Sequence, residues 1–195
     1  MNRFLGMNRF LGLLLASLLA LPTAFASAQA ADWVTDPALS TLGFTGSQSG
    51  TAFQGHFTRW QGAISFDPAH PESGQAHIVI DMTSASTGDR QKDESLPSGD
   101  WFDSKGFPQA VFDANNFHAK GGNNFEAEGT LSIRGIKKSV TLPFTLDING
   151  GTAHAKGSLA IVRTDFGVGQ GSWHDGNIVA LGVVVSFDLV AKTKP

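Results

Sequence analysis

Apolar and polar residues alternate with a period of two along much of this chain, and this pattern constrains the fold more than any other feature. In one stretch Val140, Leu142 and Phe144 are apolar, whereas Thr141 and Thr145 are polar. Such alternation gives a strand one apolar and one polar face, as in an antiparallel sheet with one side on the core. Residues 76–82, 125–134 and 179–189 repeat it, so the chain is predicted to be all-β.

The predicted strands are long and the turns between them are short. We predict strands at residues 39–48, 51–67, 75–83, 109–118, 123–134, 137–148, 151–163 and 177–190, preceded by a short strand at Trp33–Val34. Long alternating strands with short turns favour a closed barrel, which leaves no exposed edge. We therefore expect a single eight-stranded antiparallel barrel, with a two-sheet sandwich as the alternative.

One charged passage interrupts the alternation. Residues 89–96 have the composition of a helix, Asp89 is a candidate N-cap, and Pro97-Ser98-Gly99 follows. We predict a short helical insert near residues 88–105 that covers one end of the barrel.

The N-terminus has the features of a secretory signal peptide. Arg3 and Arg9 precede an apolar run at residues 10–21, and overlapping A-x-A sites place cleavage after Ala26, Ala28 or Ala30. Cleavage after Ala30 is preferred because Asp32-Trp33 begins a strand-like segment. The predicted organisation is a cleaved leader at residues 1–30 and one domain at residues 31–195, exported to the periplasm.

Composition and charge exclude several classes of partner. The chain has 14 Lys+Arg, 17 Asp+Glu and a net charge of −3, and removal of the leader removes basic residues only. An acidic chain with scattered basic residues is not expected to bind nucleic acid or an anionic membrane surface. It has no Cys, so neither disulfides nor a lipoprotein anchor are expected. After the leader no segment is apolar enough for an integral membrane protein.

Patterns that suggest catalysis or metal binding are weak. The six His have no metal-ligand spacing. Ser172, His174 and Asp175 are too close in one turn to form a hydrolase triad. We therefore expect no catalytic residue, no metal and no cofactor. Arg134 and Arg163 are expected to pair with acids of the insert and hold it to the barrel.

Three segments together resemble the signature of the YceI-like family. The first, residues 87–112, contains Lys92-Asp93, Leu96, and Asp100-Trp101-Phe102-Asp103; the others are GTLSIRGIKKSVTLPF at 129–144 and RTDFGVG at 163–169. The resemblance implies a secreted, lipocalin-like barrel that holds a polyisoprenoid lipid. The chain departs from the family pattern at Lys92, where Arg is usual, and at Ser95, where His is frequent, which puts head-group selection in doubt.

The residues themselves leave open whether the barrel is hollow. Small residues within strands, such as Ala76, Ala127, Ala155 and Gly157, leave room beside bulky ones, but glycines at the corners of a filled core would look the same. The resemblance favours a cavity. Its predicted lining is Phe53, Phe57, Ile64, Ile78, Ile80, Phe112, Leu131, Ile133, Leu142, Phe144, Phe166, Trp173, Val183 and Val185.

The expected function is to bind and shield a polyprenyl chain or isoprenoid quinone as a periplasmic carrier or store, with a role in envelope stress implied by the resemblance. The alternatives are an enzyme that acts on a lipid inside the same barrel and a filled-core interaction module without a ligand. A homodimer is left open.

Overall fold

The computed structural model describes residues 31–194, and the predicted leader lies outside these residues. The strands are β1 (Ala31–Thr35), β2 (Thr41–Gln48), β3 (Thr51–Phe57), β4 (Trp60–Phe66), β5 (Gln75–Asp81), β6 (Ala85–Ser86), β7 (Gln109–Gly121), β8 (Asn124–Ile133), β9 (Ile136–Asn149), β10 (Thr152–Val162) and β11 (Gly182–Thr193). The helices are α1 (Arg90–Ser95) and the 3-10 turns η1 (Pro71–Ser73), η2 (Met82–Ser84), η3 (Arg163–Phe166) and η4 (Gly171–Trp173).

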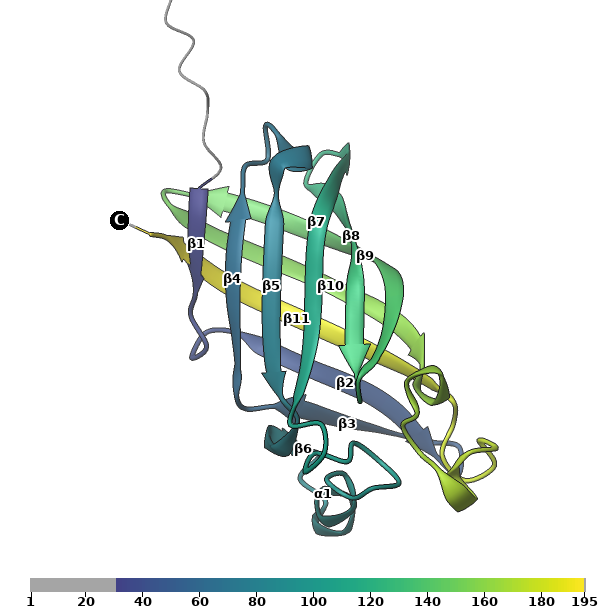
Figure 1. Ribbon diagram of the computed structural model, residues 1–195. Coiled ribbons are helices and arrows are strands. Elements are labelled where there is room, and N and C mark those ends of the chain that lie inside the picture. The colour runs from purple at the N-terminus through teal and green to yellow at the C-terminus, as the bar shows by residue number, and fades with distance from the viewer. Residues whose placement is uncertain (1–30, 195) are drawn as a thin grey trace, which may run out of the picture.

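Eight antiparallel strands close into a barrel, as predicted. The order is β1-β4-β5-β7-β8-β9-β10-β11, and β11 pairs with β1 to complete the ring (Figure 1). The short strand β1 closes the barrel because Trp33 pairs with Ile64 of β4 on one side and with Thr193 of β11 on the other. The sequence pattern predicted the barrel correctly, but it did not predict that this short strand is a member of the ring.

Strand β11 pairs with two strands in succession along one edge. Its end, Ala191–Thr193, pairs with β1, and Val184–Asp188 pairs with β2. Strands β2 and β3 therefore extend the wall beyond β1 and end in β6. In Figure 1 the strands β10, β11, β2 and β3 cross diagonally behind β4, β5, β7 and β8, and the two groups separate toward the end that carries α1.

The predicted strand at 51–67 is two strands, which corrects its boundaries. Thr58 and Arg59 leave the β3 ladder and bond instead to η2, with Thr58 N donating to Ser84 O at 3.2 Å and Arg59 N to Ser84 Oγ at 3.1 Å. This two-residue break changes the inward positions from odd numbers in β3 to even numbers in β4. Side-chain direction across the segment therefore could not be followed by simple alternation.

The predicted strand at 177–190 begins later, at Gly182. Residues 163–181 instead form a long loop, which contains η3 and η4. The apolar alternation before Gly182 does not reflect a strand because these residues are wrapped around the buried side chain of Arg163.

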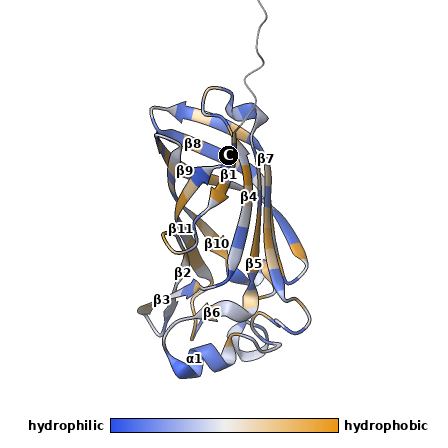
Figure 2. Cartoon of the chain, turned by 90° about the vertical axis from the view of Figure 1, so that its left-hand side faces the viewer, coloured by the Kyte–Doolittle hydropathy of each residue, from blue (hydrophilic) through white to orange (hydrophobic). Residues whose placement is uncertain are grey.

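The helical insert is present where it was predicted. Asp89 caps α1, with its side chain accepting hydrogen bonds from the backbone N–H groups of Gln91 and Lys92. The helix is hydrophilic along its length, in contrast to the mixed colouring of the strands (Figure 2). Leu96, directly after the helix, is 8% exposed, so the C-terminal end of the helix is packed into the protein.

Candidate functional site

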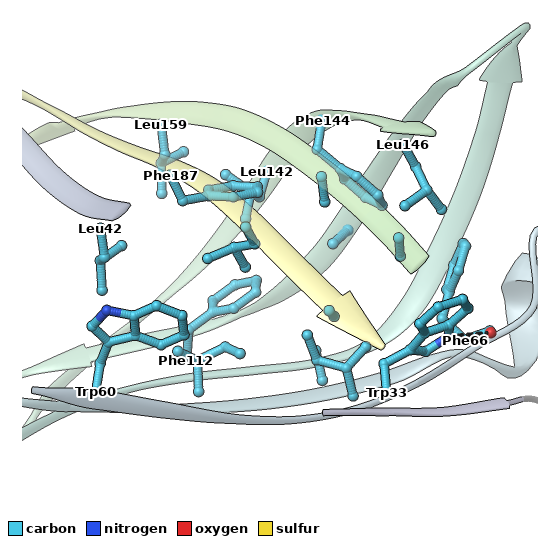
Figure 3. A pocket seen from close by; sticks show the side chains of 18 of the residues that line it. Trp33, Leu42, Trp60, Phe66, Phe112, Leu142, Phe144, Leu146, Leu159 and Phe187 are labelled. Carbon is cyan, nitrogen blue, oxygen red and sulfur yellow. Dashed lines mark hydrogen bonds between the residues drawn. The ribbon is translucent and has the colours of Figure 1, made fainter. Parts of the chain in front are cut away.

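The interior of the barrel contains a cavity of about 170 Å³. Its lining consists entirely of apolar and aromatic residues contributed by strands from all around the ring. They are Trp33, Leu42, Trp60, Ile64, Phe66, Ala76, Ile78, Ile80, Phe112, Phe117, Ala127, Leu131, Leu142, Phe144, Leu146, Ala153, Ala155, Leu159, Val185, Phe187, Leu189 and Ala191. Figure 3 shows the labelled side chains pointing from opposite walls into a common space.

The cavity wall has little capacity for polar contacts. The indole N–H of Trp33 donates to the carbonyl oxygen of Phe66 at 3.0 Å, so it is not free for a ligand. Within residues 31–194, no buried side-chain nitrogen or oxygen lacks a hydrogen-bond partner. Since the apolar surface cannot pair with polar groups, the space suits a hydrocarbon and disfavours a charged molecule.

Alanines, rather than glycines, create the free volume. Ala76, Ala127 and Ala155 line the cavity. A Cβ added to Gly157, in contrast, would lie 2.7 Å from the ring of Phe187, and one on Gly55 would lie 2.2 Å from the ring of Phe44. These glycines provide room for aromatic rings, and the space they leave is already filled.

One end of the barrel is closed by a group of aromatic rings. Phe66 lies 5.2 Å from Phe117 and 5.5 Å from Phe125, and Phe125 lies 5.6 Å from Phe144, measured between ring centroids. The three pairs are tilted, edge-on and stacked, and edge-on and offset-stacked rings are favourable geometries. This end is therefore packed with side chains, and the cavity begins beneath them.

The other end is closed by the insert and the 163–181 loop, which pack on each other. Trp101 of the insert lies 5.5 Å from Trp173 of the loop. Phe166, 2% exposed, packs with Leu131 and Val168 beside the cavity. The signature segments at residues 87–112 and 163–169 thus meet at one end of the barrel.

Arg163 and Arg134 hold this end together through carbonyl oxygens, which corrects the expectation that they pair with acids. Arg163 is 3% exposed. Its guanidinium donates hydrogen bonds to five backbone carbonyl oxygens of the 163–181 loop, which surround it. The acceptors are the carbonyl oxygens of Val168, Gly169, Trp173, Val179 and Ala180. Burial lowers the pKa of Arg163, and the charge of Asp175 partly offsets this effect.

Arg134 connects the β8–β9 turn to the insert. Its Nη1 donates to the carbonyl oxygen of Gly99 at 2.6 Å and to that of Trp101. The planar guanidinium can reach several carbonyl oxygens from one position, whereas a carboxylate partner would require the insert acids to turn inward. The insert is therefore attached to the β8–β9 turn through its backbone carbonyl groups. Its acidic side chains are left to form hydrogen bonds within the insert.

Asp93 is an example of an acid with such a local role. Its carboxylate accepts hydrogen bonds from the backbone N–H of Thr87 at 2.6 Å, the Thr87 hydroxyl at 2.7 Å and the Ser86 hydroxyl at 2.8 Å. These bonds, with that from the Thr87 N–H the largest, lower the pKa of Asp93 below its ordinary value despite the opposing effect of burial. Lys92 pairs with Asp89 at 2.8 Å instead of with Asp93.

The structure brings many of the predicted lining residues to the cavity. Those in its wall are Ile64, Ile78, Ile80, Phe112, Leu131, Leu142, Phe144 and Val185. They come from β4, β5, β7, β8, β9 and β11, so the alternation identified the inward face correctly at these positions. Their contact with a ligand stays a prediction.

The other predicted residues lie outside the cavity wall. Phe57 and Ile133 pack against the cluster at the insert end, and Phe166 fills the loop end. Val183 pairs with Ile161 on β10, near the last pairing of these strands. These side chains face inward, but they lie near the end of the barrel that carries α1. There the insert and the 163–181 loop already fill the interior.

Phe53 and Trp173 are likewise occupied elsewhere. The ring of Phe53 covers Gly46, and the ammonium of Lys92 lies 5.7 Å from its centroid. Trp173 packs on Trp101. Both rings hold the closing segments together instead of facing the free space.

Some lining residues were missed in the sequence. Trp60 and Phe66 were missed although they lie on the same face of β4 as Ile64, which was predicted. Trp33 was missed because β1 is short. Phe187 and Leu189 belong to an alternating face that the pattern did identify, so the signal was present for them.

The described residues provide little support for metal binding or a hydrolytic site. Within residues 31–194, no group of three or more His, Cys, Asp or Glu side chains is arranged to hold a metal. Asp175 accepts a hydrogen bond from Asn177 Nδ2 at 2.6 Å, and His174 donates its backbone N–H to Gly171 O. The same part of the chain has no helix long and apolar enough to cross a membrane.

Comparison with known proteins decides the family. The model of the YceI-like domain matches residues 33–191. This chain is a member of the YceI-like family. Among its relatives, a UPF0312 protein of Shewanella denitrificans is 33% identical over 138 residues, which are 69% of this chain and 71% of the relative. A UPF0312 protein of Vibrio parahaemolyticus is 31% identical over 131 residues, covering 66% and 68%.

Solved structures agree with this YceI-like fold. BcnA of Burkholderia cenocepacia superimposes with a TM-score of 0.79 at 37% identity, over 81% of this chain and 99% of BcnA. A polyisoprenoid binding domain from Saccharophagus degradans superimposes with a TM-score of 0.67 at 16% identity, over 83% and 98%. The second similarity concerns the fold alone.

Proposed function

We propose that this YceI-like protein binds an isoprenoid lipid, such as a polyprenyl chain or an isoprenoid quinone, in its barrel. The observation that carries the proposal is a cavity inside the barrel whose wall is apolar. Membership of the family and the polyisoprenoid ligand class named for the Saccharophagus domain support it. A filled core, the alternative from the sequence, is at odds with the free space between the walls.

Burial of the chain provides the driving force. About 20 chain carbons at about 0.8 kcal/mol each contribute about 16 kcal/mol in total. Loss of motion in a flexible tail offsets much of this, which leaves micromolar to nanomolar affinity. The wall selects the hydrocarbon by shape and apolarity, and no chemical step is required.

We propose binding without catalysis. The cavity wall contains no carboxylate, imidazole, ammonium, thiol or hydroxyl group, and a general acid or base must reach the reacting atom. An enzyme acting on the lipid would need such a group at the bound chain. Incubation with a bound prenyl lipid should therefore return the lipid chemically unchanged.

The proposed setting is the periplasm, where a shielded lipid could be carried or stored, including during envelope stress. The support is the leader-like composition of residues 1–30. Sequencing the N-terminus of the protein isolated from its native compartment should give Ala31 as the first residue. Retention of Met1 or Met7 would contradict export by cleavage.

The test of lipid binding is organic extraction and mass spectrometry of the protein from its native compartment, together with binding of labelled geranylgeraniol. We expect a co-purifying isoprenoid and saturable binding. Ala155→Trp, which fills the cavity, should abolish binding, whereas Lys156→Trp on the outer face of the same strand should retain it. Absence of both a co-purifying isoprenoid and saturable binding would contradict the proposal.

A further inference from the structure

The barrel wall has an unpaired seam between β9 and β10. Their ladder ends at the pair Phe144 and Gly157. Beyond this pair β9 continues to Ile136 along β8, and β10 continues to Val162 along β11. The lower halves of two neighbouring strands thus separate while each keeps its other partner, as the divergence of β9 and β10 in Figure 1 shows.

Pro143 explains where the seam begins. Leu146 N donates to Asn123 O on the β8 side, and N–H directions alternate along a strand. The nitrogen of Pro143 therefore faces β10, and proline has no hydrogen there to donate. The carbonyl of Pro143 would lie only 2.6 Å from a Cβ on Gly157, so the two strands touch at this point and then part.

The cavity is close to the outer surface at the start of the seam. A depression on the outside of the barrel is lined by Pro143 and Gly157 together with Phe144 and Phe187. The rings of Phe144 and Phe187 also line the cavity. The same two side chains therefore separate the interior from solvent.

Residues 163–169, which include η3, fill the rest of the seam. Phe166 and Val168 form a cluster with Leu131, against which Val140 of β9 and Leu159 and Ile161 of β10 pack. We call residues 163–169 the plug. Its side chains occupy the region where β9 and β10 are not paired.

The plug contacts β9 through apolar groups alone. In the described part of the chain, no hydrogen bond joins residues 163–170 to residues 136–143. At the β9 start, a Cβ on Gly167 would lie 3.4 Å from Cδ1 of Ile136. Apolar surfaces can separate and rejoin without breaking directional bonds, so this contact can open at lower cost than a strand ladder.

Arg163 fastens one end of the plug to the carbonyl oxygens of Trp173, Val179 and Ala180. The polar attachment at the other end of the plug runs through the insert. Gly169 N and Gln170 N donate to the carbonyl oxygen of Asp100 at 2.8 and 2.7 Å. Arg134 holds the neighbouring residues Gly99 and Trp101 to the β8–β9 turn. The plug is thus fastened to β9 indirectly, by one backbone contact at Asp100.

The other openings are closed more firmly. At the end opposite the insert, the aromatic rings lie inside a ring of paired strands. On the β3 side, β6 pairs with β3 and Thr58 N donates to Ser84 O at 3.2 Å. Met82 N donates to Pro108 O at 2.9 Å, which ties this side to β7. Strand pairing and backbone hydrogen bonds thus contribute to the closure on these sides, whereas the seam is closed by side chains.

We propose that the lipid enters and leaves sideways, through the seam between β9 and β10, when the plug separates from β9. This inference rests on the proposed function, because it assigns the route to that same cavity. The plug moves as a unit because Arg163 holds Val168 and Gly169 by their carbonyl oxygens. The Asp100 contact is the latch.

The first test measures the association and dissociation rates of fluorescent geranylgeraniol. Phe166→Ala removes the largest side chain of the plug and should raise both rates about tenfold, with Kd changed by less than about threefold. Phe117→Ala, at the far end of the cavity, should change Kd through the dissociation rate alone. Unchanged rates in Phe166→Ala would overturn the proposed route.

The second test locks the latch, and it remains decisive if Phe166→Ala does not fold. The chain has no Cys, so Asp100→Cys combined with Gln170→Cys introduces a single disulfide. Oxidation should slow both rates at least about tenfold, and reduction should restore them. Exchange at the original rate in the oxidised protein would refute the route. Loss of equilibrium binding in the unmodified protein would instead refute the proposed function.

Discussion

At the scale of the residue, Arg163 shows how a buried charge organises a loop without an acidic partner. Its donors reach five carbonyl oxygens of residues 168–180, and the side chain is 3% exposed. Carbonyl dipoles from several directions can replace the hydration of a guanidinium, whose planar fork suits such a set of acceptors.

We expect Arg163→Lys to lower the free energy of unfolding by at least about 2 kcal/mol, because an ammonium cannot reach all the acceptors and leaves buried carbonyls unpaired. Urea denaturation measures this. Arg59→Lys is the control, since Arg59 forms an exposed pair with Asp81 and should cost less than about 1 kcal/mol. Equal losses in the two variants would show that the five carbonyl oxygens around Arg163, which we call the carbonyl cage, stabilise the fold no more than an exposed ion pair does.

The carbonyl cage of Arg163 also requires a glycine at position 169, because the guanidinium occupies the space that a side chain would take. Its φ is +83°, and an added Cβ would lie 1.9 Å from Nη1 of Arg163. Gly50, with φ of +79°, has no atom within 4 Å of an added Cβ. Gly50→Ala should therefore cost only the backbone strain of about 1–2 kcal/mol, and Gly169→Ala should cost about 2 kcal/mol more. Denaturation of the two variants separates strain from collision, and equal costs would argue against a tight fit at Gly169.

At the scale of the element, the insert is stabilised by Asp93, whose carboxylate accepts bonds from Thr87 and Ser86. The folded protein lowers the pKa of Asp93 below 3.8. The ionised form is therefore favoured in the folded state, and its stabilisation is present above pH 4 and lost as the pH falls through the folded pKa.

Asp93→Asn should cost about 1–2 kcal/mol at pH 7 and less at pH 3, because below the ordinary carboxyl pKa the unfolded chain takes up a proton and the stabilisation by the ionised form decreases. The measurement is the unfolding free energy at both pH values. Glu94→Gln, which removes an exposed pair with Arg90, should have a small effect at each pH. A cost for Asp93→Asn that does not depend on pH would contradict the role of its charge.

At the scale of the whole molecule, the barrel leaves a cavity unfilled, and its ligand should therefore stabilise the fold. A lipid that binds only the folded state at a free concentration of 100 times its Kd adds about 2.7 kcal/mol. For a chain of this size, that corresponds to a rise in Tm of about 5–10 °C. Calorimetry of delipidated protein with added geranylgeraniol measures it. Ala155→Trp should show no such rise, and a rise equal to that of wild type would place the ligand outside the cavity.

Local chemistry was readable in the sequence. Alternation predicted the strands and the barrel, and the N-cap at Asp89 was predicted correctly because a short polar side chain before a helical segment acts on its own neighbours. Leu142, Phe144 and Val185 could be placed in the interior for the same reason, since the direction of a side chain follows from the period of its own strand.

Long-range pairing was decided by tertiary structure alone. Whether β1 or β2 closes the ring depends on which part of β11 each can reach, and the break at Thr58 and Arg59 depends on bonds to Ser84 far along the chain. The carbonyl cage of Arg163 and the seam at Pro143 likewise arise from segments that meet only in the folded barrel. Alternation shows whether a side chain points into or out of the barrel. Where along the barrel axis free space remains depends on how all the strands, the insert and the 163–181 loop pack together.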